Sequence, residues 1–171
     1  MRNKMIMLIS LLFLMTLVGC NNTDKNETRE LSSTFSLPFT FGDGTEGEYL
    51  FIGEEGKVGL LVGSGKTGEV VEEKIIANKE SKYMWHFWGD SETISGDFKI
   101  VGTDEKGKEH PVLVSESKTV WQYPNTPISP NDGADSHIPS NMVFPTSGLW
   151  KLEIYFNEKL FGELVINVEN S

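Results

Sequence analysis

The sequence predicts an all-β protein in which two sheets pack as a β-sandwich within a single domain. Short apolar or alternating runs recur from Phe35 onward, and glycine-rich turns separate them at intervals of about ten residues. Patterns with the period of an amphipathic helix are nearly absent, apart from residues 70–79, where β-branched side chains favour a strand. About eight to ten strands in one domain favour a two-sheet sandwich, with a partly closed barrel as the alternative.

The expected strands follow one another at short intervals along the chain. The first covers residues 35–41 and is assigned to a sheet edge because Pro38 cannot donate a ladder hydrogen bond. The strands expected after it cover residues 48–52, 58–62, 69–77, 83–88, 94–102, 112–114, 119–123, 150–156 and 160–168. Glycine-rich turns are expected at residues 42–47, 53–56, 63–68 and 104–107.

The clearest strand pattern runs from Trp150 to Phe156. Apolar side chains alternate there with mostly polar ones, so one face of the strand is expected to point into the core. Residues 157–159 then turn the chain into the last strand, where Leu164, Ile166 and Val168 continue the inner face.

Another expected strand carries bulky side chains on both faces. Tyr83, Trp85 and Phe87 are expected on one face, and His86 and Trp88 on the other. A central strand covered on both sides explains this pattern and makes His86 a buried, hydrogen-bonded residue. The functional alternative is a ligand histidine beside an aromatic wall, with His86 and Trp88 as site residues.

The segment between Tyr123 and Trp150 interrupts the strand pattern. It contains five prolines and is expected to form a long loop, residues 124–148, with little room for a long strand. Loops of this length in compact domains are usually either functional or disordered, and its apolar residues suggest that this one packs. The candidate binding residues of this loop are Asp132, Asp135, His137 and Met142.

Some of these residues are also candidate metal ligands. The spacing of Asp135 and His137 places two side chains on one side of an extended segment, and with His86 and Met142 they suit copper or another divalent ion. Short polar residues in loops also cap turns, which is the structural explanation. We therefore expect no cofactor, assign no metal ligand, and keep a metal-handling protein as the alternative function.

The sequence contains no catalytic signature. Neither Gly-x-Ser-x-Gly nor His-Glu-x-x-His occurs, and residues 63–67 (GSGKT) have Leu60 where a phosphate-binding loop needs its first glycine. We expect residues 63–67 to form a hairpin turn. A cell-wall hydrolase that uses two of the 25 acidic residues is the second alternative, although no particular pair is marked.

The N-terminal segment has the layout of a secretory signal peptide. Arg2 and Lys4 precede an apolar run that ends at Val18, and a small residue precedes Cys20, the single cysteine. The apolar run of about fourteen residues is shorter than the roughly twenty that span a bilayer, which disfavours a transmembrane helix. Residues 17–20 (LVGC) resemble the bacterial lipobox, which implies cleavage before Cys20 and a diacylglycerol on its thiol.

The chain is therefore expected to have three parts. Residues 1–19 are the signal peptide, residues 20–34 are the lipidated cysteine with a flexible polar tether, and residues 35–171 are the β-sandwich domain. A flexible tether of about fourteen residues has a root-mean-square reach of roughly 20 Å. This reach is enough to lift the domain off the surface of the membrane.

The composition limits the classes of partner. Fifteen basic residues face 25 acidic ones, for a formal net charge of −10, which argues against nucleic acid and against electrostatic binding to anionic lipids. Membrane attachment must then come from the lipid on Cys20. The protein is therefore expected to be a membrane-anchored extracytoplasmic lipoprotein that acts as a non-enzymatic binding module. Its partner is expected to be a protein or a component of the cell envelope, and its oligomeric state is unknown.

Four motifs carry a resemblance to a known family. Residues 83–89 (YMWHFWG), 133–140 (GADSHIPS), 148–152 (GLWKL) and 160–162 (LFG) are similar to uncharacterised lipoproteins of Gram-positive, bacillus-like bacteria. The resemblance implies a lipoprotein with a β domain and transfers no catalytic residue. The pattern Phe-Pro-x-x-Gly-x-Trp-x-Leu in residues 144–152 also resembles the last hairpin of immunoglobulin-like bacterial surface domains, which implies an immunoglobulin-like sandwich.

Overall fold

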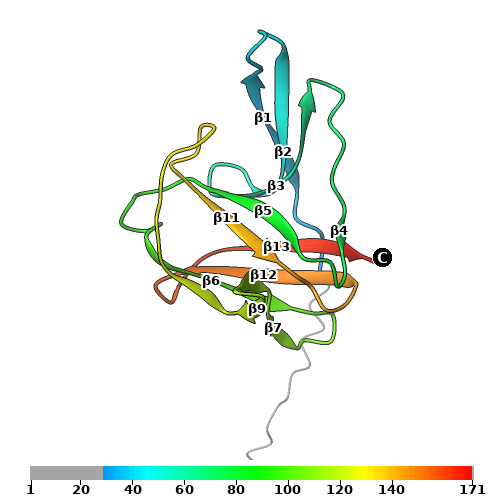
Figure 1. The fold of residues 1–171 in the computed structure, drawn as a ribbon, viewed down its shortest axis with the longest axis vertical. Coiled ribbons are helices and arrows are strands. Elements are labelled where there is room, and N and C mark those ends of the chain that lie inside the picture. Colours follow the sequence, from blue (N-terminus) through cyan, green and yellow to red (C-terminus); the bar gives the residue numbers. More distant parts are fainter. Residues whose placement is uncertain (1–28, 171) are drawn as a thin grey trace, which may run out of the picture.

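The computed structural model describes residues 29–170, which form two packed β-sheets. Figure 1 shows the sheets as the two layers of a sandwich, so the predicted all-β sandwich is confirmed. Residues 29–170 contain no helix, and hence none that is long and apolar enough to cross a bilayer. The predicted signal peptide, Cys20 and the tether as far as residue 28 lie outside the described residues.

The strands divide into a seven-stranded and a six-stranded sheet. The seven-stranded sheet, sheet A, has the order β1 (Thr34–Thr40), β2 (Glu46–Glu54), β3 (Val58–Lys66), β5 (Ser81–Phe87), β11 (Ser136–Met142), β8 (Leu113–Ser115) and β9 (Lys118–Val120). The six-stranded sheet, sheet B, has the order β10 (Gln122–Thr126), β6 (Gly96–Thr103), β12 (Gly148–Phe156), β13 (Lys159–Glu169) and β4 (Ile75–Ile76), and β7 (Glu109–Pro111) pairs separately with β6.

The hairpin of β12 and β13 forms where the sequence predicts it. Every second residue of β12 from Trp150 to Phe156 is buried, because strand side chains alternate between the two faces of the sheet. Asn157 and Glu158 connect the two strands with positive φ angles of 47° and 64°, as a tight hairpin turn requires.

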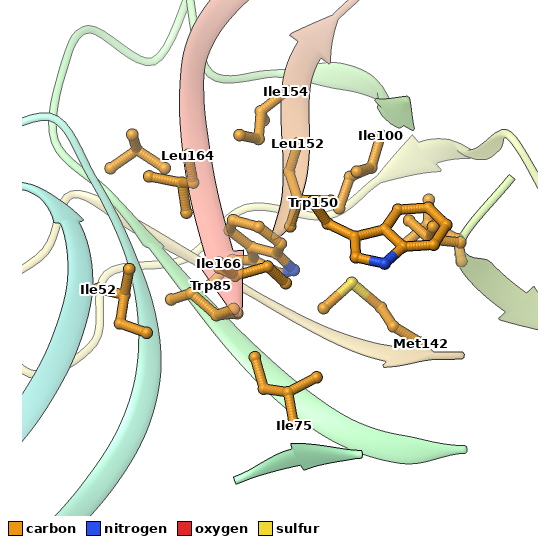
Figure 2. Packing of buried hydrophobic residues seen from close by; sticks show 14 of the residues in the cluster. Ile52, Ile75, Trp85, Ile100, Met142, Trp150, Leu152, Ile154, Leu164 and Ile166 are labelled. Atoms are coloured by element: carbon orange, nitrogen blue, oxygen red, sulfur yellow. The ribbon is translucent and has the colours of Figure 1, made fainter. Parts of the chain in front are cut away.

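The core lies between the two sheets. Trp85 of β5 and Trp150 of β12 are fully buried, and Figure 2 shows them with Met142 among aliphatic side chains of both sheets. Each indole N–H has a partner: Trp85 Nε1 donates to Ser140 Oγ at 3.0 Å, and Trp150 Nε1 to the carbonyl of Thr146 at 2.9 Å. Burial of a large apolar side chain contributes on the order of 2 kcal/mol, so this packing is a major source of stability.

The segment that follows Tyr123 is not one long loop, and this part of the sequence analysis is wrong. Strand β11 occupies its middle and pairs with β5 along its whole length. Pro139 fits there because β8 pairs with β11 only at Asn141 and Met142, which leaves a position in the ladder that needs no N–H donor. His137 and Met142 therefore lie in a strand.

Two other expectations between β3 and β5 need correction. Residues 63–66 do not form a turn but continue β3, where they pair with β2. The strand expected at residues 69–77 is reduced to β4, whose two isoleucines pair in parallel with the end of β13. The β-branched residues of this segment therefore give only a short strand at the sheet edge.

Residues 29–33, which the sequence analysis assigns to the tether, lie against the domain. Arg29 Nη1 donates to the backbone carbonyls of Thr103 and Leu149, at 2.9 and 3.3 Å. Ser32 exchanges two hydrogen bonds with Val165 of β13, through its amide and its hydroxyl. The first described residues are thus fixed to sheet B before the chain enters β1 of sheet A.

Candidate functional site

Aromatic rings gather on the outer face of sheet A, which is turned away from sheet B. We call this group the aromatic face; its members are Phe35 and Phe39 of β1, Tyr49 and Phe51 of β2, and His86 and Trp88 at the end of β5. Ring centroids are 5.2 Å apart for Phe35 and Phe51, and 4.8 Å apart for Phe51 and His86. Neighbouring rings at such distances attract one another beyond simple area burial.

Glycines under the aromatic face let its rings lie directly on the backbone. A Cβ atom at Gly59 of β3 would lie 2.9 Å from ring atoms of both Phe35 and Phe51. A Cβ atom at Gly47 of β2 would lie 2.8 Å from Phe39. The close packing of these rings therefore depends on positions that carry no side chain.

His86 is buried in the aromatic face without a hydrogen-bond partner. Its side chain is 1% exposed, and neither ring nitrogen has a partner among residues 29–170. Burial lowers the pKa of His86, nearby His137 lowers it further, and Asp132 opposes the shift. The imidazole is thus neutral at pH 7, with one nitrogen as donor and the other as acceptor. The hydrogen bond that the sequence analysis expected for His86 is absent from the described part of the chain.

Residues 129–135 fold over the end of β5 beside His86, and we call them the capping segment; they lie within the connection from β10 to β11 that is yellow in Figure 1. Trp88 Nε1 donates to the carbonyl of Gly133 at 2.9 Å, and the amide of Gly89 donates to Asp135 Oδ2 at 2.8 Å. Asp132 and Gly133 have positive φ angles of 47° and 81°, which make a tight turn between Asn131 and Ala134. The capping segment is thus held on the domain by side-chain and backbone bonds.

Two ionisable residues approach His86 from β11 and the capping segment. His137 is the direct cross-strand neighbour of His86, with ring centroids 6.4 Å apart. His137 Nδ1 donates to the carbonyl of Ser129 at 2.8 Å, so its Nε2 is the acceptor nitrogen when the ring is neutral. Asp132 Oδ2 lies 3.9 Å from His86 Nε2, which is too far for a hydrogen bond.

The structure separates the predicted binding residues into two groups. Asp132, Asp135 and His137 lie around the end of β5, close to His86 and Trp88. Met142 is fully buried in the core, on the opposite face of β11 from His137. Within residues 29–170, no group of three or more His, Cys, Asp or Glu side chains is placed to hold a metal ion.

Most of the aromatic face was not predicted from the sequence. His86 and Trp88 were named as candidates, but Phe35, Phe51 and Gly59 were not, because these residues meet only after β1, β2, β3 and β5 pair. A usable signal exists in β3, where Gly59 leaves room on the backbone for the rings of Phe35 and Phe51. A glycine inside a strand often marks a place where another group approaches the backbone closely.

The fold and the aromatic face define a β-sandwich domain with one candidate recognition surface. Residues 45–166 match the family described as a domain of unknown function, DUF4871, and the chain belongs to this family. Among solved structures, a crystal structure of a candidate lipoprotein from Bacillus anthracis is similar, with 27% identity and a TM-score of 0.58. That match covers 82% of this chain and 86% of the other. A search of curated proteins gives no significant match.

Proposed function

We propose that this protein is a lipoprotein held at the extracytoplasmic face of a bacterial cell membrane by a diacylglycerol on Cys20. The motif at residues 17–20 and the acidic charge support this anchor, because an acidic surface by itself does not bind anionic lipids. The similar chain from Bacillus anthracis, itself described as a candidate lipoprotein, supports it independently. Residues 1–19 would be removed, and the tether would begin at Cys20.

We further propose that the β-sandwich is a non-enzymatic binding module and that the aromatic face is its recognition surface. The observation that carries this proposal is His86, a buried imidazole whose two nitrogens have no partner in the part of the chain that the structure describes. An unsatisfied buried polar group costs about 1–3 kcal/mol, and a folded domain retains such a cost most readily at a functional site. A ligand that displaces the capping segment would give His86 the missing hydrogen bond.

The partner is expected to be a protein or a component of the cell envelope with an apolar contact surface. Aromatic rings supply large, rigid contact area, and Phe41 at the end of β1 is 37% exposed beside Phe39. One hydrogen bond to His86 at the centre of this surface would add specificity. The net charge of −10 disfavours a strongly anionic partner.

Lipid attachment is tested in a Gram-positive host that lipidates its own exported proteins. The full chain and its Cys20→Ser variant are grown with labelled palmitate and separated into membrane and soluble fractions. The wild-type chain should carry the label and stay in the membrane fraction, whereas the variant should carry none. Label on the Cys20→Ser variant would contradict the proposed anchor.

The recognition surface is tested by site-specific photo-crosslinking of the full chain in its cells. A photoreactive phenylalanine replaces Tyr49, whose ring lies against those of Phe39 and Phe51 in the aromatic face. A discrete crosslinked product is expected at this position. The matched control places the same residue at Leu160 of β13, which is 52% exposed and outside the aromatic face.

The His86→Leu variant decides the role of the imidazole in this experiment. Loss of the Tyr49 product in this variant, with the domain still folded, would support recognition through His86. Identical products from the Tyr49 and Leu160 positions, or a Tyr49 product that persists in His86→Leu, would contradict the proposal.

A further inference from the structure

A hollow of about 410 Å³ opens on sheet B, at the edge of β6, and its volume is within the range of ligand sites. Two short strands share this edge: β10 pairs with residues 96–99 of β6, and β7 with residues 101–103. The hollow lies where one of these strands gives way to the other. Its lining residues are Lys99, Val101, Glu109, Trp121 and Gln122.

Trp121 differs from the other tryptophans of the chain. Trp85, Trp88 and Trp150 each donate the indole N–H to a protein oxygen. The indole N–H of Trp121 has no partner among residues 29–170, and the side chain is 42% exposed. Its backbone is nevertheless fixed, because its carbonyl accepts a hydrogen bond of 3.1 Å from the amide of Ile100. The backbone at Trp121 is therefore fixed, and its partly exposed indole lines the hollow.

One lining residue of the hollow, Lys99, shows how an aromatic ring and a carboxylate beside it can hold a cation. Lys99 Nζ lies 5.3 Å from the centroid of the Tyr155 ring and 2.8 Å from Glu158 Oε2, so one cation is shared by an aromatic ring and a carboxylate. Trp121 and Glu109, which both line the hollow, supply a second aromatic ring and a second carboxylate. In the described part of the chain, the Glu109 carboxylate makes no ion pair or hydrogen bond, so this second pair holds no cation of the protein itself.

We propose that this hollow binds an arginine side chain of a basic protein partner, stacked on Trp121 and paired with Glu109. A planar guanidinium suits both contacts better than an ammonium group, because it stacks on a ring face and can bridge both carboxylate oxygens. The net charge of −10 adds a general attraction for a basic segment. The site lies outside the aromatic face and goes beyond the function proposed above.

The test uses the lipidated, isotope-labelled full chain in detergent micelles and a short probe peptide, acetyl-Gly-Arg-Gly-amide. The reporter is the indole N–H resonance of Trp121 in nuclear magnetic resonance spectra. This resonance should shift saturably with the probe and less so as salt is added, while the other three indole signals stay in place. The matching peptide with citrulline, which has the same shape without charge, should cause no shift.

Two substitutions distinguish binding of the probe at this site from general attraction to an acidic surface. Glu109→Gln should weaken the probe by about fivefold or more, which is the loss expected for one partly exposed cation contact. Glu55→Gln, at an exposed position with no ion pair to any of residues 29–170, should leave binding unchanged. Equal shifts with arginine and citrulline, or equal weakening by the two substitutions, would overturn the inference. Crosslinking at Tyr49 reports on a different face, so either proposal can fail without the other.

Discussion

Among single residues, His86 has the clearest unmet need for hydrogen bonds, because both nitrogens of its imidazole are buried with no partner within residues 29–170. We expect His86→Leu to raise the free energy of unfolding at pH 7 by about 1 kcal/mol, since the change removes two unsatisfied polar atoms at similar volume. Urea denaturation of the two chains measures the difference. A loss of stability instead would mean that the ring contributes packing that leucine cannot replace.

The same residue should make stability depend on pH. Burial lowers the pKa of His86 in the folded chain, so below about pH 6.5 the unfolded chain binds a proton that the folded chain does not. The free energy of unfolding should therefore fall as the pH is lowered from about 6.5 towards the folded pKa, by at most about 1.4 kcal/mol per pH unit.

Comparison with His86→Leu isolates this effect, because Asp132 and His137 are present in both chains. The difference in thermal midpoint between the two chains should widen as the pH falls from 7.5 to 5.5. A constant difference over this range would show that His86 is protonated in the folded state and that its charge is accommodated there.

Among the elements, β3 supports the aromatic face through a residue without a side chain. Gly59→Ala would place a methyl group 2.9 Å from ring atoms of Phe35 and Phe51, and displacing them should cost about 1–3 kcal/mol. Gly42→Ala is the matched control, because a Cβ atom there meets nothing within 4 Å. The control should change stability by less than about 1 kcal/mol in thermal or urea unfolding. Equal effects at both positions would mean that the rings can move without cost.

The strands that the sequence predicted well are those whose inner positions are all apolar. The β12–β13 hairpin is an example, because its inner residues from Trp150 to Phe156 reveal the period of two. Strand β11 escaped prediction because two of its inner positions are Ser136 and Ser140, and Pro139 lies between them. Its serines are buried all the same, and Ser140 satisfies the indole of Trp85. Such a partner is visible only in three dimensions.

The candidate site was predictable only in part, for the same reason. His86 and Trp88 stood out because bulky residues occupy both faces of one strand. Their partners from β1 and β2 depend on the pairing of strands that are distant in sequence, such as Gly59 with His86. The capping segment was marked by its composition, but its contacts with Trp88 and Gly89 depend on the β5–β11 pairing.

For the molecule as a whole, the attachment of residues 29–33 extends the folded domain to the N-terminal side of β1. We expect Arg29→Ala to lower the thermal midpoint by roughly 3 °C, because its guanidinium satisfies backbone carbonyls of Thr103 and Leu149. Glu30→Ala, at the exposed neighbouring position, should leave the midpoint unchanged. Differential scanning calorimetry measures both. An unchanged midpoint in Arg29→Ala would place the start of the ordered domain at Ser32 or later.

The hydrogen bonds of residues 32 and 33 also determine how a pull on the N-terminal end is resisted. Ser32 bonds to Val165 of sheet B, and the carbonyl of Ser33 accepts from the amide of Gly53 in sheet A, so neighbouring residues tie the chain to both layers. Tension applied to the N-terminal end of the domain is then divided between two sheets before it loads β1. The sandwich should therefore yield at higher force when pulled from its N-terminal end than if β1 alone carried the load.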